Sequence, residues 1–183
     1  VDPNNIYFDS TDTTEDDNTN DNGNVEIGEG AVGILQSIWS AYEEENKFAA
    51  GGGDSANMMM DEPGVFDVNN TEELDATLGF PTDYADKIDD AASLMHMMNA
   101  NTITVAAYHV VDGTDMAALA DEVKASVMAT QWMCGFPEKL VIVTVEDYMV
   151  SYFGHADIVD TFTGKLTAVY TSAEVVVDEA IVA

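Results

Sequence analysis

The sequence has no arginine, five lysines and one cysteine, and each scarcity excludes a class of function. Without arginine there is no planar guanidinium group to hold a phosphate or carboxylate in a bidentate manner. The five lysines stand singly among 35 acidic residues, and the formal net charge is −30. Nucleic-acid binding needs clustered cations that displace the counterions of phosphates. We therefore expect no nucleic-acid partner, which leaves an unknown protein or a cation.

Several motifs are also missing. Cys134 has no second cysteine to pair with, so an intrachain disulfide and a zinc site built from cysteine pairs are both excluded. No run of 18 apolar residues is present, and we expect no transmembrane segment. The glycines at 51–53 precede Asp54, whose charge repels phosphate, and neither a nucleophile elbow nor a zinc-protease motif occurs. We assign no catalytic and no cofactor-binding residue, leave enzymatic activity uncertain, and favour a non-enzyme.

Two regions differ in composition. Residues 1–30 contain nine acidic residues and no base, and such a segment cannot bury enough apolar surface to offset its ordering entropy. We predict an acidic flexible linker over 1–30 and a single α+β domain over 31–183. The sequence begins with Val1 rather than Met, which we interpret as a processed or trimmed chain. Apolar residues make up 46% of the sequence, enough for a sizeable core.

The apolar periodicity of the domain predicts a mixture of helices and strands. We expect an N-terminal helix over 31–48, a loop over 49–70 and the core over 71–183. The predicted fold is α+β, with a small, largely antiparallel sheet of three to four strands packed against amphipathic helices. The core elements that we expect are a helix from Pro81 to Asn101, a strand over 102–111, a helix capped at Thr114 or Asp115 and closed by Gly135, a hairpin over 139–153, a helix over 158–169 and an edge strand over 173–177.

Residues 18–29 have the spacing of a calcium-binding loop. Oxygen-bearing side chains occupy positions 1, 3, 5, 9 and 12, with Gly23 at position 6. An asparagine stands at position 1, where such loops carry aspartate, and no amphipathic helix precedes the segment. A polar tail without bound metal is the alternative interpretation. The candidate calcium ligands are Asn18, Asn20, Asn22, Glu26 and Glu29.

Methionine is concentrated at 58–60 and at 95–98, where His96 interrupts the run. Thioether and imidazole groups are soft ligands of the kind that Cu(I) prefers. On a helix, however, Met95 and Met98 share a face and His96 points elsewhere. The alternative is that these methionines fill gaps in the core. For His96, His109 and His155, which are isolated in sequence, we favour a structural role.

The segment from about Leu74 to Tyr170 carries three features in order. They are a helix ending at Ala100, a strand from Ile103 to Val111 followed by Asp112-Gly113 and a capped helix, and a hairpin before a final helix. In these it resembles a family of predicted lipoproteins of Gram-positive bacteria that carries a domain of unknown function. The resemblance implies an extracytoplasmic protein on the bacterial cell surface, held by a lipid anchor upstream of Val1. It implies no enzymatic residues.

Together these observations predict an extracytoplasmic, non-enzymatic binding or structural domain. One alternative is a carboxylate- or metal-dependent hydrolase whose acids converge only in the folded chain. A deep pocket with two buried, convergent carboxylates would favour that hydrolase, whereas shallow surfaces with outward-pointing acids would favour a binding module. Another alternative is the soluble acidic protein of a halophile, which predicts unfolding when salt is removed.

Overall fold

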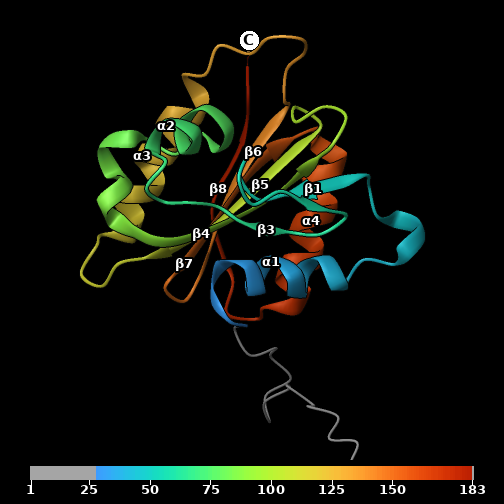
Figure 1. Ribbon diagram of the computed structural model, residues 1–183, viewed down its shortest axis with the longest axis horizontal. Coiled ribbons are helices and arrows are strands. Elements are labelled where there is room, and N and C mark those ends of the chain that lie inside the picture. The colour runs from blue at the N-terminus through green and yellow to red at the C-terminus, as the bar shows by residue number, and fades with distance from the viewer. Residues whose placement is uncertain (1–27, 183) are drawn as a thin grey trace, which may run out of the picture.

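A single antiparallel sheet forms the middle layer of the protein, with helices on both of its faces (Figure 1). The computed structural model describes residues 28–182. Seven of its eight strands pair in the order β2-β1-β4-β5-β7-β6-β8. The eighth, β3, pairs with β4 next to β1. The strands are β1 (Ala50–Gly52), β2 (Met59–Met60), β3 (Gly64–Val65), β4 (Ile88–His96), β5 (Ile103–Val110), β6 (Lys139–Val145), β7 (Tyr148–Gly154) and β8 (Glu174–Ala180).

The helices divide the hydrophobic core into two clusters. Helices α1 (Gly30–Ser40) and α4 (Ala156–Val169) pack on one face of the sheet. Helix α3 (Met116–Met128) packs on the other face, together with the short α2 (Thr71–Glu73) and the π-helical turn η2 (Leu74–Leu78). The 3-10 turns η1 (Glu44–Asn46) and η3 (Thr82–Lys87) complete the helical segments.

Strand β5 shows why the sheet is central. Val105 and Ala107 face the α1 and α4 side, whereas Ala106 and Tyr108 face the α3 side, and all four are buried. A strand covered on both faces has an almost continuous apolar sequence instead of an alternating one. Each large apolar side chain buried in this way contributes about 1.5–3 kcal/mol to folding.

Carboxylates hold the beginnings of the three long helices. The side chain of Asp115 accepts a hydrogen bond from the backbone N–H of Ala118 at 3.0 Å, which confirms the predicted cap of α3. The Asp90 side chain on β4 accepts from the N–H of Ala31 at 2.7 Å, and the Glu138 side chain accepts from the N–H of Ala156 at 2.8 Å. Negative charge at these ends also complements the helix dipoles.

The prediction of a small sheet with three to four strands was wrong, because the sheet has eight. The expected helix from Pro81 to Asn101 is a 3-10 turn followed by the long strand β4. Since β4 is paired on both sides and largely buried, its apolar residues show no period-two alternation. The expected loop over 49–70 contributes the three short strands β1, β2 and β3.

The second half of the chain follows the prediction more closely. Strands β6 and β7 form the expected hairpin, and Glu146 takes a positive φ of 54° at its turn. Strand β8 lies at the edge of the sheet, as predicted. The α3 helix, however, ends at Met128, well before Gly135.

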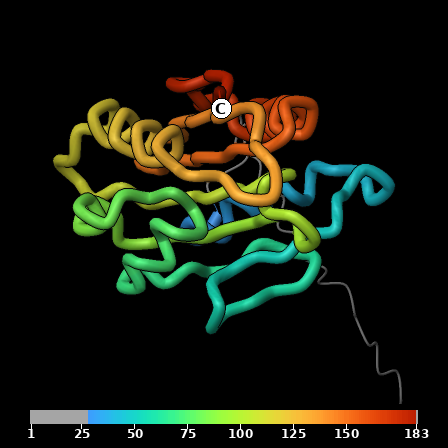
Figure 2. Tube along the Cα trace, turned by 90° about the horizontal axis from the view of Figure 1, so that it is seen from above, coloured from blue at the N-terminus to red at the C-terminus, as the bar shows by residue number. Residues whose placement is uncertain are grey.

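The two edges of the sheet are formed by different kinds of strand. Figure 2 shows the short strands β1 to β3 at one end and β8 at the other. Among residues 28–182, no helix is long and apolar enough to cross a membrane.

Candidate functional site

Each of the five lysines forms an ion pair with a carboxylate. Four of them have one such partner, and Lys139 has two. No lysine lines the hollows described below, so these cations create no basic patch around a cavity. The pairs are Lys47–Glu44, Lys87–Asp86, Lys124–Glu179, Lys139–Asp160, Lys139–Asp178 and Lys165–Glu43.

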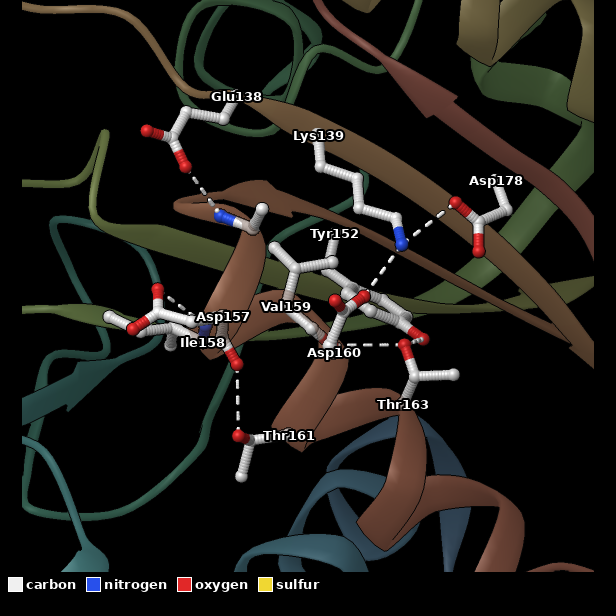
Figure 3. Close-up of polar contacts among 11 residues, drawn as sticks. Glu138, Lys139, Tyr152, Asp157, Ile158, Val159, Asp160, Thr161, Thr163 and Asp178 are labelled. Carbon is white, nitrogen blue, oxygen red and sulfur yellow. Dashed lines mark hydrogen bonds and ion pairs between the residues drawn. The ribbon is translucent and has the colours of Figure 1, made fainter.

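Lys139 joins three elements of the fold (Figure 3). From the start of β6, its Nζ lies 2.6 Å from Asp160 of α4 and 2.9 Å from Asp178 of β8. The hydrogen bonds to these carboxylates raise the pKa of the lysine. Beside it, Tyr152 and Thr163 share a hydrogen bond of 2.7 Å between β7 and α4. This network attaches α4 and β8 to the sheet, and we interpret it as structural.

His109 lies between two carboxylates at the end of the sheet that carries the β6–β7 turn. Its Nδ1 contacts Asp89 of β4, and its Nε2 lies 3.0 Å from Asp147. Hydrogen bonding to Asp89 is the largest influence on the pKa of His109 and raises it, and Asp147 adds to this effect against partial burial. Because the two acids approach different nitrogens, the ring separates them. This arrangement favours an imidazolium ion with two ion pairs rather than a shared metal ligand set.

Asp54 is the buried acid of the described structure, with 4% of its surface exposed. Its carboxylate accepts hydrogen bonds from the backbone N–H groups of Ala56, Asn57 and Asp67 and from the Asn57 side chain. Burial raises the pKa of Asp54, but these hydrogen bonds outweigh it and lower the pKa overall. A carboxylate so fully occupied fastens the loops around β1 and β3 and is unsuited to acid–base catalysis.

A methionine-rich surface distinguishes the β1 to β4 end of the molecule. Two hollows of about 310 and 280 Å³ lie on it, and a third of about 260 Å³, which has no methionine in its lining, lies beside them between η2, β5 and the loop after α3. The first and second share Met58 in their linings, and the second and third share Ala100. We call these three hollows the methionine path. Its exposed methionines, with their exposed fractions, are Met58 (70%), Met59 (40%), Met97 (47%) and Met98 (83%).

The lining of the methionine path is almost uncharged, although the protein carries 35 acidic residues. Asp75, in the third hollow, is the one acid among the lining residues. Acids stand just outside the first hollow: Asp61 and Glu62 precede Pro63, which lines it. An exposed apolar surface with a polar rim is typical of a binding site. The sequence had shown the methionine clusters, but not that strand pairing brings them together.

The predicted calcium loop lies almost entirely outside the described residues. Asn18, Asn20, Asn22 and Glu26 lie outside residues 28–182. Glu29 is exposed at the N-cap of α1 and makes no side-chain capping hydrogen bond. Calcium binding by this segment stays a prediction.

The histidine and cysteine candidates are dispersed. The Nδ1 of His96 accepts hydrogen bonds from the backbone N–H groups of Met98 and Asn99, at 3.2 and 3.4 Å, and its ring stacks on Phe48. His155 is the exposed N-cap residue of α4. Cys134 is exposed in the loop after α3 with a φ of 64°.

Within residues 28–182, no three side chains of histidine, cysteine, aspartate or glutamate are grouped as they would be to hold a metal ion. Comparison of the chain with protein-family models, with curated proteins and with solved structures found no match. The resemblance to bacterial lipoproteins stays a prediction. The methionine path is therefore the candidate site that the geometry supports best.

Proposed function

We propose that this chain is a non-enzymatic binding domain whose methionine path takes up an apolar, positively charged segment of another protein. The observation that carries the proposal is a group of three neighbouring hollows, uncharged or nearly so, on a strongly acidic protein. Shallow apolar surfaces of this kind suit a partner protein better than a small substrate.

Methionine suits this role because its unbranched thioether chain adapts to different apolar partners. Met58, Met97 and Met98 are about half exposed or more, so their side chains are free to rearrange around a ligand. Acidic residues elsewhere supply the second element of recognition. A negative field accelerates the approach of a basic segment, and the apolar hollows then hold its apolar face.

A hydrolase is the weaker interpretation of the same structure. It requires catalytic carboxylates that converge in a pocket. The buried carboxylate of Asp54 is occupied by backbone donors, and Asp89 and Asp147 contact opposite nitrogens of His109. These three acids therefore have structural partners instead of converging on a pocket.

Calorimetric titration with a synthetic amphipathic peptide of leucine and lysine tests the proposal. A peptide with glutamine in place of leucine keeps the charge and lacks the apolar face, so it separates the two contributions. We expect the leucine peptide to bind at least tenfold more tightly, and the double variant Met58→Gln/Met98→Gln to lose most of this difference. As a matched control, Val175→Gln/Val176→Gln alters two exposed apolar residues of β8 and should leave binding unchanged. Equal affinity of both peptides would contradict the proposal.

We also propose, from the resemblance to lipoproteins, that this domain is part of a lipid-anchored bacterial protein and lies outside the cytoplasm. The linker predicted over 1–30 would then hold it away from the membrane. The coding sequence upstream of Val1 tests this directly. A signal peptide that ends in a lipid-attachment cysteine would support the location, and a cytoplasmic domain there would contradict it.

A further inference from the structure

The second hollow of the methionine path has an unusual lining. Six of the ten methionines of the chain lie at 58–60 and 95–98, and four of these six line this one hollow of about 280 Å³. No lysine, aspartate or glutamate lines it. The four methionines are Met58, Met95, Met97 and Met98.

The glycines of β1 leave room for these side chains. Gly51 pairs with Met95 across the β1–β4 ladder, and Gly51, Gly52 and Gly53 all line the hollow. A Cβ atom on Gly51 would lie 3.3 Å from the Cγ of Met97. Met95 lies in β4, which ends at His96, and Met97 and Met98 follow in the bend after the strand, yet all three line the same hollow. Thioether groups from two segments therefore share a hollow that has no side chains on its β1 side.

Core filling does not explain these methionines. Met58, Met97 and Met98 are exposed by 70%, 47% and 83%, and only Met95 packs against the core. His96 also lines the hollow, but its Nδ1 accepts two backbone hydrogen bonds. That nitrogen is therefore already engaged by the backbone. The available donors are thioether sulfurs.

We propose that this hollow binds a soft monovalent cation, Cu(I), through the thioethers of Met58, Met95, Met97 and Met98. Thioether sulfur selects Cu(I), whereas zinc and Cu(II) prefer imidazole and magnesium and calcium prefer carboxylate oxygen. The net charge of −30 raises the local concentration of cations without placing a hard ligand in the hollow. The methionine side chain has three rotatable bonds, which allow the exposed side chains to close on a small ion.

This inference goes beyond the binding of a protein segment, because it depends on sulfur and not on apolar surface. Substitution of methionine by leucine separates the two, since leucine keeps an apolar side chain of similar volume and lacks the thioether. The Met95→Leu/Met97→Leu variant should lose the metal, whereas its affinity for the leucine–lysine peptide, measured in parallel, reports separately on the apolar surface that both proposals share. Failure of one proposal is therefore distinguishable from failure of the other.

The test uses Ag(I) nitrate as a redox-inert probe in chloride-free buffer, followed by Cu(I) with a competing chelator. The protein carries Cys134→Ser, because the exposed thiol of Cys134 would bind either ion by itself. Methyl-labelled methionine resonances report which side chains take part. We expect one ion per chain, with shifts at the four lining methionines and unchanged signals from the buried Met149.

Two variants complete the experiment. Met95→Leu/Met97→Leu should bind Ag(I) and Cu(I) at least tenfold more weakly, with a preserved thermal melt. The control Met59→Leu/Met60→Leu alters two methionines of β2 that do not line this hollow, and its affinity should match that of the parent. Equal affinity of the two variants, or saturable binding without shifts at the four lining methionines, would overturn the proposal.

Discussion

The Nε2 atom of His109 on β5 lies 3.0 Å from a carboxylate oxygen of Asp147 at the β6–β7 turn. Its Nδ1 atom meets Asp89 on β4, and its ring packs edge-on against Tyr148. Both ring nitrogens can donate to these acids only when the imidazole is protonated. The contact therefore joins three strands through a titrating group.

The stability of the protein should depend on the protonation of His109. Hydrogen bonding to Asp89 and Asp147 raises the pKa of His109 in the folded state above its unfolded value of about 6.5. The ion pairs are thus fully present below about pH 6.5, and their contribution is lost as the pH rises through the raised folded pKa. We expect His109→Gln to lower the melting temperature at about pH 6 and to have little effect at about pH 9.

Thermal melts at a series of pH values measure this dependence. His155→Gln is the matched control, because it removes an exposed histidine that makes no side-chain capping hydrogen bond. The difference in melting temperature between the parent protein and His109→Gln should shrink as the pH increases. A difference that is constant with pH would contradict the ion-pair interpretation.

Asp54, the buried carboxylate of the loops around β1 and β3, should be the most costly acid to remove. Asp54→Ala leaves the backbone N–H groups of Ala56, Asn57 and Asp67 without their acceptor, and the site is nearly inaccessible to water. Hydrogen bonds to charged groups contribute about 1.5–3 kcal/mol each, so we expect the free energy of unfolding to fall by about 3–4 kcal/mol. Denaturant titration measures it, with the exposed Asp121→Ala as a control of equal charge change. Similar losses for both variants would refute this role.

Lys139 should contribute more to stability than the other lysines do. Its Nζ contacts carboxylates from two elements and its side chain is 20% exposed, whereas Lys87 pairs only with its exposed neighbour Asp86. Exposed pairs contribute little, typically about 0.2–1 kcal/mol, and Lys139→Gln breaks two pairs that are only partly exposed. We expect a loss of about 1–2 kcal/mol for Lys139→Gln and less than about 0.5 kcal/mol for Lys87→Gln, from urea titration. The reverse order would exclude Lys139 as the attachment of α4 and β8.

Added salt should stabilise the fold. The five lysines are all paired, and five cations are too few to neutralise most of the 35 acidic residues of the sequence. Repulsion among these acids is weakened as the Debye length falls from about 30 Å at ~0.01 M salt to about 3 Å at ~1 M. The melting temperature should rise over this range, equally in sodium and potassium chloride. A melting temperature that does not change with salt concentration would contradict this account of the surface. It would also contradict the halophile alternative.

The sequence allowed the second half of the fold to be predicted and misled in the first half. Strands β6 and β7 are apolar runs of strand length on either side of a short turn, and the side chain of Asp115 is a cap of local origin. Strand β4 was interpreted as a helix because Ile88, Ala91 and Met95 also fit a helical period. Its strand character comes from pairing with β1, β3 and β5, which is tertiary information.

The candidate site was visible only in part. The runs at 58–60 and 95–98 showed where methionine is concentrated, but a helix over 95–98 would have directed the side chains differently. Two-residue strands such as β2 carry no periodic signal, so the pairing of Gly51 with Met60 could not be predicted. The two carboxylate partners of His109 could not be predicted either, because Asp89 and Asp147 are 20 and 38 residues away in the sequence.

The most direct test is to locate the bound peptide. Methyl-labelled methionine NMR spectroscopy during titration with the leucine–lysine peptide reports on all ten methionines at once. We expect the largest shifts at Met58, Met59, Met97 and Met98, with the buried Met149 unchanged. Peptide binding that leaves these four methyl signals in place would show that the methionine path is not the binding surface.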